Sequence, residues 1–218
     1  MERWKKIVYA LVLILPLGCD AQQNNDRQVE RLDNPELDYQ SLDTATFAGG
    51  CFWCIEAAFE QINGVEEAVS GYAGGSEENP TYSAVSGGKT GHTETVEIYF
   101  DPGKIDYSTL LDIFFTAHDP TQLNRQGPDI GKQYRSAIFF HNEEQKQLAE
   151  IKIKDIDASG EYSKKVVTEL VPFTKFWMAE DYHQDYEKHH PKDPYIVNVS
   201  RPKIDKVAEK FAHLLKDD

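Results

Sequence analysis

The sequence predicts an α+β fold, because strand-like runs and helical repeats follow one another in the order β-α-β-β-α-β. This is the order of a ferredoxin-like plait, and the chain continues beyond it into a long, partly irregular C-terminal extension with a terminal helix. The chain has 218 residues, of which 40% are hydrophobic, and this is enough for one core. A single folded domain is therefore expected, and wholesale disorder is excluded.

The predicted strands are β-like runs bounded by glycine, proline or asparagine. The first, at 44–49, ends at a Gly-Gly pair, and the run at 93–100 alternates most clearly. The alternation puts one set of side chains of this run on the apolar face: Glu94, Val96, Ile98 and Phe100. The remaining predicted strands are 65–72, 136–140 and, in the extension, 166–171, which Pro172 closes.

The predicted helices show apolar residues at spacings of three and four. The first runs from Phe52 to Ile62 and stops at Asn63-Gly64, and the second covers 107–117. A third is capped by Asn142, ends at Gly160 and is expected to turn Leu148, Ile151 and Ile156 inward. The last begins at Ser200 or Arg201, with an apolar face of Ile204, Val207, Phe211 and Leu214.

The charge of the chain excludes one class of partner. The formal net charge is −14 at pH 7, and no basic run follows the first residues. A polyanion would be repelled by this field, so no nucleic-acid partner is expected.

The N-terminus has the features of a bacterial secretory signal. Basic residues at positions 3, 5 and 6 precede an apolar run over 7–17 that is too short to span a membrane. The run leads into LPLGC, which resembles a lipobox with Pro16 in the place of leucine. We expect a signal peptide over 1–18, lipidation of Cys19 and a location at the cell envelope. Cleavage elsewhere and residence in the cytoplasm are the alternatives.

Residues 19–44 are predicted to be a polar tether. They are rich in Asn, Gln, Asp and Glu, and their isolated apolar residues fit neither a strand nor a helix period for long. Such a segment behaves as a flexible linker. The folded domain is therefore expected over 45–218.

Cys51 is placed for reactivity by its local sequence. It follows a predicted strand and a Gly-Gly pair and opens a predicted helix, where unpaired N–H groups and the helix dipole favour an anion. The thiolate is the nucleophilic form of cysteine, so we expect a stabilised thiolate at Cys51. The alternative is a small buried apolar residue.

Cys54 lies three residues further along the same predicted helix. At this spacing the two Cβ atoms are about 5–6 Å apart and a disulfide is within reach. The pair fits a thioredoxin-like dithiol, half of a zinc site, or a nucleophile with its resolving cysteine. Zinc is disfavoured, because the chain has no second cysteine pair and the histidines at 183, 189 and 190 lack a recognised ligand spacing.

Glu94 is the candidate proton donor. Its side chain points with the apolar face of its strand, where loss of hydration raises the pKa of a carboxyl toward neutral pH. The alternative is a strand-end carboxylate that escapes into solvent past Gly91.

Separated motifs follow one another in one order between about Ala45 and Tyr195. They are GCFW at 50–53, Tyr82, TGHTE at 90–94, HDPT at 118–121, NRQG at 124–127, Asp129, Gly131, QYRS at 133–136, and AEDYHQ at 179–184 with Tyr186. Together they resemble the A-type peptide methionine sulfoxide reductase family. The N-terminal segments and the last helix lie outside the resemblance.

The resemblance implies a reaction with named parts. Cys51 attacks the sulfur of methionine sulfoxide, Glu94 gives a proton to the oxygen, and Cys51 is left as a sulfenic acid. The resemblance implies that Phe52 and Trp53 form an aromatic cage for the substrate methyl group. It also implies that the hydroxyls of Tyr82 and Tyr134 bind the sulfoxide oxygen and that the carboxylate of Asp129 holds the substrate backbone. The family also implies a preference for the S epimer. Core packing is the alternative for the aromatic residues.

The chain departs from the family at one position. Many members have glycine where this chain has Cys54 and resolve the sulfenic acid with later cysteines, but here no cysteine follows residue 54. We expect Cys54 to form a disulfide with Cys51, or an external thiol to act directly, and a thioredoxin-like reductant to recycle the enzyme. No metal, flavin or nucleotide cofactor is expected. The substrates would be oxidised proteins or free methionine sulfoxide, and a monomer is expected.

Two other functions are open from the sequence. A general dithiol–disulfide oxidoreductase would use Cys51 and Cys54 but would leave Glu94, Tyr82 and Asp129 without roles. A surface-anchored binding module would simply bury the cysteine pair.

Overall fold

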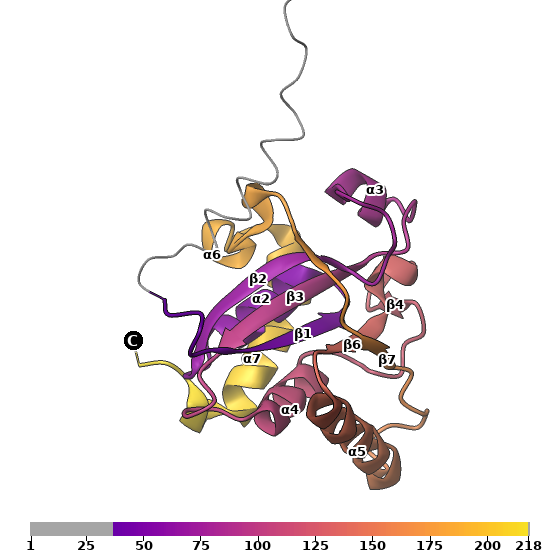
Figure 1. Ribbon diagram of the computed structural model, residues 1–218. Helices are drawn as coiled ribbons and strands as arrows, with labels where there is room; N and C mark the ends of the chain where they lie inside the picture. Colours follow the sequence, from indigo (N-terminus) through magenta and orange to yellow (C-terminus); the bar gives the residue numbers. More distant parts are fainter. Residues whose placement is uncertain (1–36, 218) are drawn as a thin grey trace, which may run out of the picture. The chain divides into compact units, whose positions relative to one another are not determined.

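The computed structural model describes residues 37–217, which form a mixed α/β domain around a six-stranded sheet (Figure 1). The strand order is β7-β6-β1-β3-β2-β8. β6 and β7 pair in parallel, and the other neighbouring strands pair antiparallel. The strands of this sheet are β1 (Asp43–Gly49), β2 (Val65–Ala73), β3 (Thr93–Phe100), β6 (Ser136–Phe140), β7 (Glu169–Pro172) and β8 (Phe176–Met178).

Three helices build the layer that covers the apolar face of the sheet. α2 (Phe52–Glu60) and α4 (Tyr107–Ala117) contact the sheet, and α7 (Arg201–Lys210) packs on both of them (Figure 1). α5 (Glu143–Ser159) lies beside α4, β6 and β7. The shorter helical segments are α3 (Tyr82–Ser86), α6 (Tyr186–His189), and the turns η1 (Lys132–Tyr134), η2 (Asp181–His183), η3 (Ile196–Ser200) and η4 (Ala212–Leu214).

Stacked aromatic rings form the centre of the core. Phe47 of β1 is fully buried, and its ring lies 5.8 Å from that of Phe59 in α2 and 4.8 Å from that of Phe114 in α4. Burial of each such side chain contributes about 1.5–3 kcal/mol. The core therefore joins β1 to both helices, and β1 leads directly to Cys51. No helix within residues 37–217 has the length and apolar character needed to cross a membrane.

Several predicted elements are confirmed. β3, α4 and β6 have the predicted bounds, and α2 and β2 begin where expected. Asn142 caps α5, because its Oδ1 accepts a hydrogen bond from the N–H of Gln145 at 2.9 Å, and Gly160 ends the helix with a φ of 74°. The last helix buries Ile204 and Val207 as predicted, but it ends at Lys210, so that Phe211 is its buried C-cap and Leu214 lies, partly buried, in η4.

The elements that the sequence did not predict are short. They are α3, α6, β8, the turns η1, η2 and η3, and the hairpin of β4 (Arg125–Gln126) and β5 (Asp129–Ile130). The strand predicted at 166–171 forms only from Glu169, as β7. Elements of two to five residues are stabilised by the partners they pair with, and they are too short to show a periodicity.

The prediction that Ile151 points inward is wrong, because its side chain is 54% exposed. α5 packs through a narrow face that includes the buried Gln145 and Ala149, and Ile151 falls outside it. Helical spacing of apolar residues therefore predicts burial less well for a helix at the edge of a domain than for a helix that covers a sheet.

The alternation of β3 is confirmed on the predicted face, where Glu94 and its neighbours are buried. The opposite face is buried as well, because segments outside the sheet cover it. Thr93 donates a hydrogen bond to the carbonyl of Gln133 at 2.7 Å, and Tyr39 packs edge-on against Tyr99 with ring centroids 5.1 Å apart.

The first strand of the sheet begins before residue 45, where the folded domain was expected to start. β1 starts at Asp43, which pairs with Phe100, and Tyr39 already packs on the sheet. The end of the predicted tether therefore belongs to the fold. The predicted signal peptide, Cys19 and the rest of the tether lie outside the described residues.

Candidate active site

Cys51 is held at the junction of β1 and α2 by a backbone turn that suits glycine. β1 ends at Gly49, Gly50 has a φ of 99°, and Cys51 is the N-cap of α2. A Cβ atom on Gly50 would lie 2.5 Å from the Cβ of Gln126. A side chain at position 50 would thus strain the backbone and displace Gln126, so the glycine determines where the Cys51 sulfur lies.

Glu94 reaches from β3 to the first turn of α2. Its side chain is 2% exposed, and its Oε2 accepts a hydrogen bond from the backbone N–H of Phe52 at 3.2 Å. Burial is the main cause that raises its pKa to about 8, and the charges of Asp129 and Cys54 add to the effect. The predicted burial and raised pKa are confirmed, and the solvent-exposed alternative is wrong. A largely protonated carboxyl lies beside Cys51 at neutral pH.

The thiol of Cys51 is not the acidic one of the pair. Burial is the main cause that raises its pKa well above the ordinary value, and Cys54 and Glu94 raise it further, whereas the Tyr195 hydroxyl lowers it. The prediction of a stabilised thiolate at Cys51 is therefore wrong for the substrate-free site. Loss of hydration outweighs the field of the helix N-terminus here.

Cys54 takes the larger share of the negative charge. A hydrogen bond from Cys51 is the main cause that lowers the pKa of Cys54 to about 7, and Lys203 and Ser200 lower it further, against the effect of burial. The Cys54 sulfur lies 3.0 Å from Ser200 Oγ and 3.8 Å from Lys203 Nζ. Both cysteines are buried free thiols in this structure.

Trp53 forms an aromatic wall next to the cysteines. Its ring stacks on Tyr186 with centroids 3.8 Å apart and planes 9° apart, and Tyr195 meets it edge-on at 5.9 Å. Its indole N–H donates to Nδ1 of His183 at 3.2 Å. Phe52 is 1% exposed and lies behind this wall, 5.1 Å from the His183 ring. Trp53 can therefore contact a ligand. Phe52 also belongs to the core, which was the alternative to a substrate-binding role for this residue.

His183 supports this wall as a neutral imidazole. Burial is the main cause that lowers its pKa to about 4. Because Nδ1 accepts from Trp53, the ring proton lies on Nε2, which is buried and has no hydrogen-bond partner among the described residues.

The polar side of the site comes from three further segments. Burial, followed by the charge of Glu94, raises the pKa of the Tyr82 and Tyr134 phenols, and Cys51 adds to both shifts. Both phenols therefore keep their protons and can donate hydrogen bonds. Asp129 of β5 accepts a hydrogen bond from the Tyr195 hydroxyl at 2.5 Å.

The structure thus brings all of the predicted site residues in the domain together: Cys51, Phe52, Trp53, Cys54, Tyr82, Glu94, Asp129 and Tyr134. Sequence reasoning did not assign roles to Tyr195, Ser200 or Lys203, which contact the same group from the C-terminal segment. Tyr195 is 66 residues from Asp129, so no local spacing could have indicated the pair.

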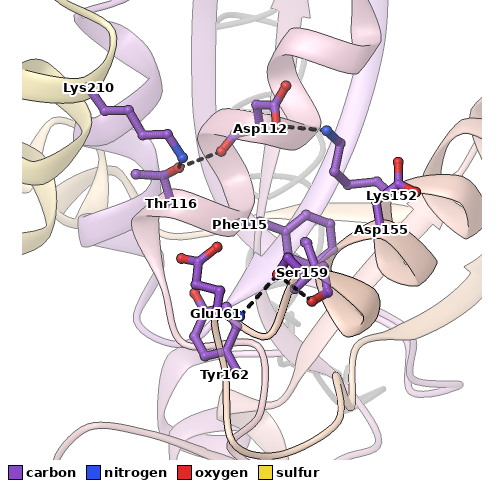
Figure 2. Close-up of a pocket in the computed structure, with 10 residues that line it drawn as sticks. Asp112, Phe115, Thr116, Lys152, Asp155, Ser159, Glu161, Tyr162 and Lys210 are labelled. Carbon is purple, nitrogen blue, oxygen red and sulfur yellow. Dashed lines mark hydrogen bonds and ion pairs between the residues drawn. The ribbon is translucent and has the colours of Figure 1, made fainter.

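A separate hollow of about 190 Å³ lies where α4, α5 and Lys210 of α7 meet. Figure 2 shows that both of its lysines have partners: Lys152 pairs with Asp112 at 2.8 Å, and Lys210 donates to Thr116 at 3.2 Å. None of its lining residues belongs to the predicted site. In the described part of the chain, no three His, Cys, Asp or Glu side chains are grouped so that they could hold a metal ion.

Comparison with known proteins places the site in a family context. Residues 43–215 match the family model described as "Peptide methionine sulfoxide reductase". The chain is 52% identical over 169 residues to the peptide methionine sulfoxide reductase MsrA of Natronomonas pharaonis, which covers 78% of this chain and 95% of that protein. It is 51% identical over 172 residues to the protein of the same name from Thermus thermophilus, across 79% and 97% of the two chains.

Solved structures are similar as well. The methionine sulfoxide reductase A of Corynebacterium diphtheriae superposes with a TM-score of 0.62 at 35% identity, over 69% of this chain and 76% of that one. Mxr1 from Saccharomyces cerevisiae in its reduced form gives a TM-score of 0.64 at 35% identity, over 72% and 90% of the two chains.

The raised pKa of Glu94 predicts how the variant Glu94→Gln changes stability with pH. The folded protein holds the Glu94 proton up to a pKa of about 8, whereas an unfolded glutamate loses it near about 4.3. Wild type therefore loses stability relative to Glu94→Gln as pH rises between these values, by about 5 kcal/mol in total at about 1.4 kcal/mol for each pKa unit.

Urea denaturation of both proteins at pH values across this window measures the difference. Glu144→Gln, which removes an exposed carboxyl, serves as the control for loss of a side-chain charge. A difference between Glu94→Gln and wild type that is constant with pH would contradict the raised pKa.

Proposed function

The chain belongs to the peptide methionine sulfoxide reductase family, whose members are oxidoreductases that reduce methionine sulfoxide, and we propose that Cys51 and Glu94 carry this reaction here. The observation that supports these roles is the buried Glu94 carboxyl, protonated at neutral pH and bonded to the N–H that follows Cys51. A general dithiol oxidoreductase has no need of such a proton donor. The substrates are methionine sulfoxide residues of oxidised proteins, or the free amino acid.

The proposed reduction transfers oxygen from substrate to cysteine. The Cys51 thiolate attacks the sulfoxide sulfur while Glu94 gives its proton to the oxygen, and methionine leaves as a thioether. The oxygen ends on Cys51 as a sulfenic acid, so the sulfoxide gains two electrons and Cys51 loses two. A neutral Glu94 also exerts no repulsion on the Cys51 thiolate, and the Tyr195 hydroxyl favours that ionised form.

The surrounding side chains suit a sulfoxide. The Trp53 wall, backed by Phe52, offers an apolar surface for the methyl group. The Tyr82 and Tyr134 hydroxyls, which stay protonated, are donors for the sulfoxide oxygen. Asp129 is the carboxylate for the substrate backbone, and we propose the family's preference for the S epimer.

Recycling is proposed to run through Cys54. Cys54 follows Cys51 within the first turn of α2 and its pKa is lowered to about 7, so its thiolate is the nearest nucleophile for the sulfenic acid. The resulting disulfide would be reduced by a thioredoxin-like protein or another dithiol through thiol–disulfide exchange, with no further cofactor.

Two more assignments are proposals. The antiparallel order β6-β1-β3-β2, with α2 after β1 and α4 after β3, supports a ferredoxin-like plait at the centre of the domain. We also propose that the N-terminal segment makes the protein a lipoprotein of the bacterial envelope, monomeric and attached through Cys19 alone.

Glu94→Gln tests the proton donor. The variant keeps the shape of the side chain but cannot donate an acidic proton, so the reduction step should slow by about 10²–10⁴-fold. Single-turnover release of methionine at neutral pH measures this step. Glu97→Gln is the matched control, because Glu97 is a buried carboxyl of the same strand on the opposite face, and it should stay near the wild-type rate. A wild-type rate for Glu94→Gln would remove the assigned role.

Cys54→Ser tests the resolving cysteine. We expect about one methionine per enzyme in a single turnover, because reduction needs only Cys51. The Cys51 sulfenic acid should then accumulate and react with dimedone, and turnover with thioredoxin should collapse while small thiols partly restore it. If the variant turns over with thioredoxin like wild type, and oxidised wild type holds no Cys51–Cys54 disulfide by mass spectrometry, Cys54 has only a packing role.

Cys19→Ala tests the anchor. Wild type should partition with the membrane fraction and carry a lipid-modified N-terminal Cys19, and the variant should be released, because no second anchor is proposed. Fractionation and N-terminal mass spectrometry measure both. A wild-type protein that is wholly soluble, with its N-terminus at another residue, would rule out lipidation.

A further inference from the structure

Cys54 is not surrounded by apolar side chains alone. Its sulfur, fully buried, contacts Ser200 Oγ at 3.0 Å and Lys203 Nζ at 3.8 Å. Both partners come from the C-terminal segment, 146 and 149 residues further along the chain. A buried cysteine that only fills space needs neither a hydroxyl nor an ammonium group beside its sulfur.

The backbone around Ser200 is shaped to make this contact. Ser200 is fully buried and ends η3, a π-helical turn that runs directly into α7. π-Turns inserted into helices re-aim side chains and are frequent at functional sites. The turn lets Ser200 face Cys54 from the first residues of the helix, while Lys203 follows within the first turn of α7.

The charges around Cys54 define what Lys203 does. Four other groups interact with Cys54: Cys51 at the N-cap of the same helix, Glu94 of β3, Asp129 of β5 and the Tyr195 hydroxyl. Each of these four is neutral or negative, and within residues 37–217 no ion pair joins Lys203 to a carboxylate. The ammonium group is therefore available to balance a negative sulfur.

We propose that Ser200 and Lys203 activate Cys54 for disulfide formation, the hydroxyl by donating a hydrogen bond to its thiolate and the ammonium by balancing its charge. This inference rests on the proposed resolving role of Cys54. The Cys54 thiolate attacks the sulfur of the Cys51 sulfenic acid, the S–S bond forms and the S–O bond breaks. The departing hydroxide takes up a proton and leaves as water, so the two thiol sulfurs together supply the two electrons that the substrate received.

Lys203→Met and Ser200→Ala separate this role from simple packing. Both should slow Cys51–Cys54 disulfide formation after a single turnover more than they slow release of methionine, because the resolving thiolate is depleted while the reducing step uses a different sulfur. At neutral pH we expect a loss of about threefold to tenfold, which corresponds to a pKa shift of up to about one unit.

The pH profile is the decisive readout. In wild type the rate of disulfide formation should rise with pH around the Cys54 pKa of about 7, and in both variants the rise should move to higher pH. Above about pH 9 all rates should converge, because thiols then ionise without help. Lys203→Arg keeps the charge and should resemble wild type, and so should Lys206→Met, an exposed lysine of the same helix. Acid quench, thiol blocking and mass spectrometry count the disulfide at each time.

A second measurement serves if a variant is poorly folded. In a Cys51→Ser background, the thiolate absorbance of Cys54 should titrate at higher pH after Lys203→Gln than without it. Unchanged rates and titrations in the Lys203 and Ser200 variants, or a slowing that is equal at all pH values, would overturn this inference and leave Cys54 as the resolving cysteine. If wild type forms no Cys51–Cys54 disulfide, the resolving role is wrong and this inference is overturned with it.

Discussion

The site depends on the hydrogen bond between the Glu94 carboxyl and the N–H of Phe52, which joins the central strand β3 to the start of α2. An ionised carboxylate at this depth would be costly, because it would lose its hydration without gaining a cation. The carboxyl keeps its proton instead, and its pKa rises to about 8. The hydrogen bond therefore positions the carboxyl beside Cys51, while burial, which outweighs the lowering effect of that bond on the pKa, keeps the carboxyl largely protonated at neutral pH.

The same burial decides how charge is shared between the two thiols. The helix start favours an anion at Cys51, but loss of hydration and the neighbouring Cys54 oppose it. Cys54 receives compensation that Cys51 lacks, from Ser200 and Lys203. In the substrate-free site the pKa of Cys51 is therefore raised and the pKa of Cys54 is lowered. This arrangement suits the proposed cycle, in which Cys51 acts first on a bound substrate and Cys54 acts afterwards.

The C-terminal segment completes the site. Tyr195 bonds to Asp129, His183 holds the indole of Trp53, and Ser200 with Lys203 contacts Cys54. The β1–α2 turn alone would present a cysteine on a helix end with no wall around it. Because α7 packs on both α2 and α4, the core of the domain and the far side of the site are stabilised by the same helix.

The sequence by itself determined the order of the main elements, the bounds of β3, α4 and β6, the caps of α5 and the burial of Glu94. These depend on local periodicity, capping and alternation, which a single segment carries. Only the tertiary structure decided the pKa of the Cys54 thiol, because burial, Lys203 and Ser200 act on it in addition to the neighbouring Cys51, and the last two lie almost 150 residues away. The short β4–β5 hairpin, the exposure of Ile151 and the contact of Tyr195 with Asp129 were likewise decided by packing. Pairing between distant segments exists only once those segments meet, so no pattern within one segment can encode it.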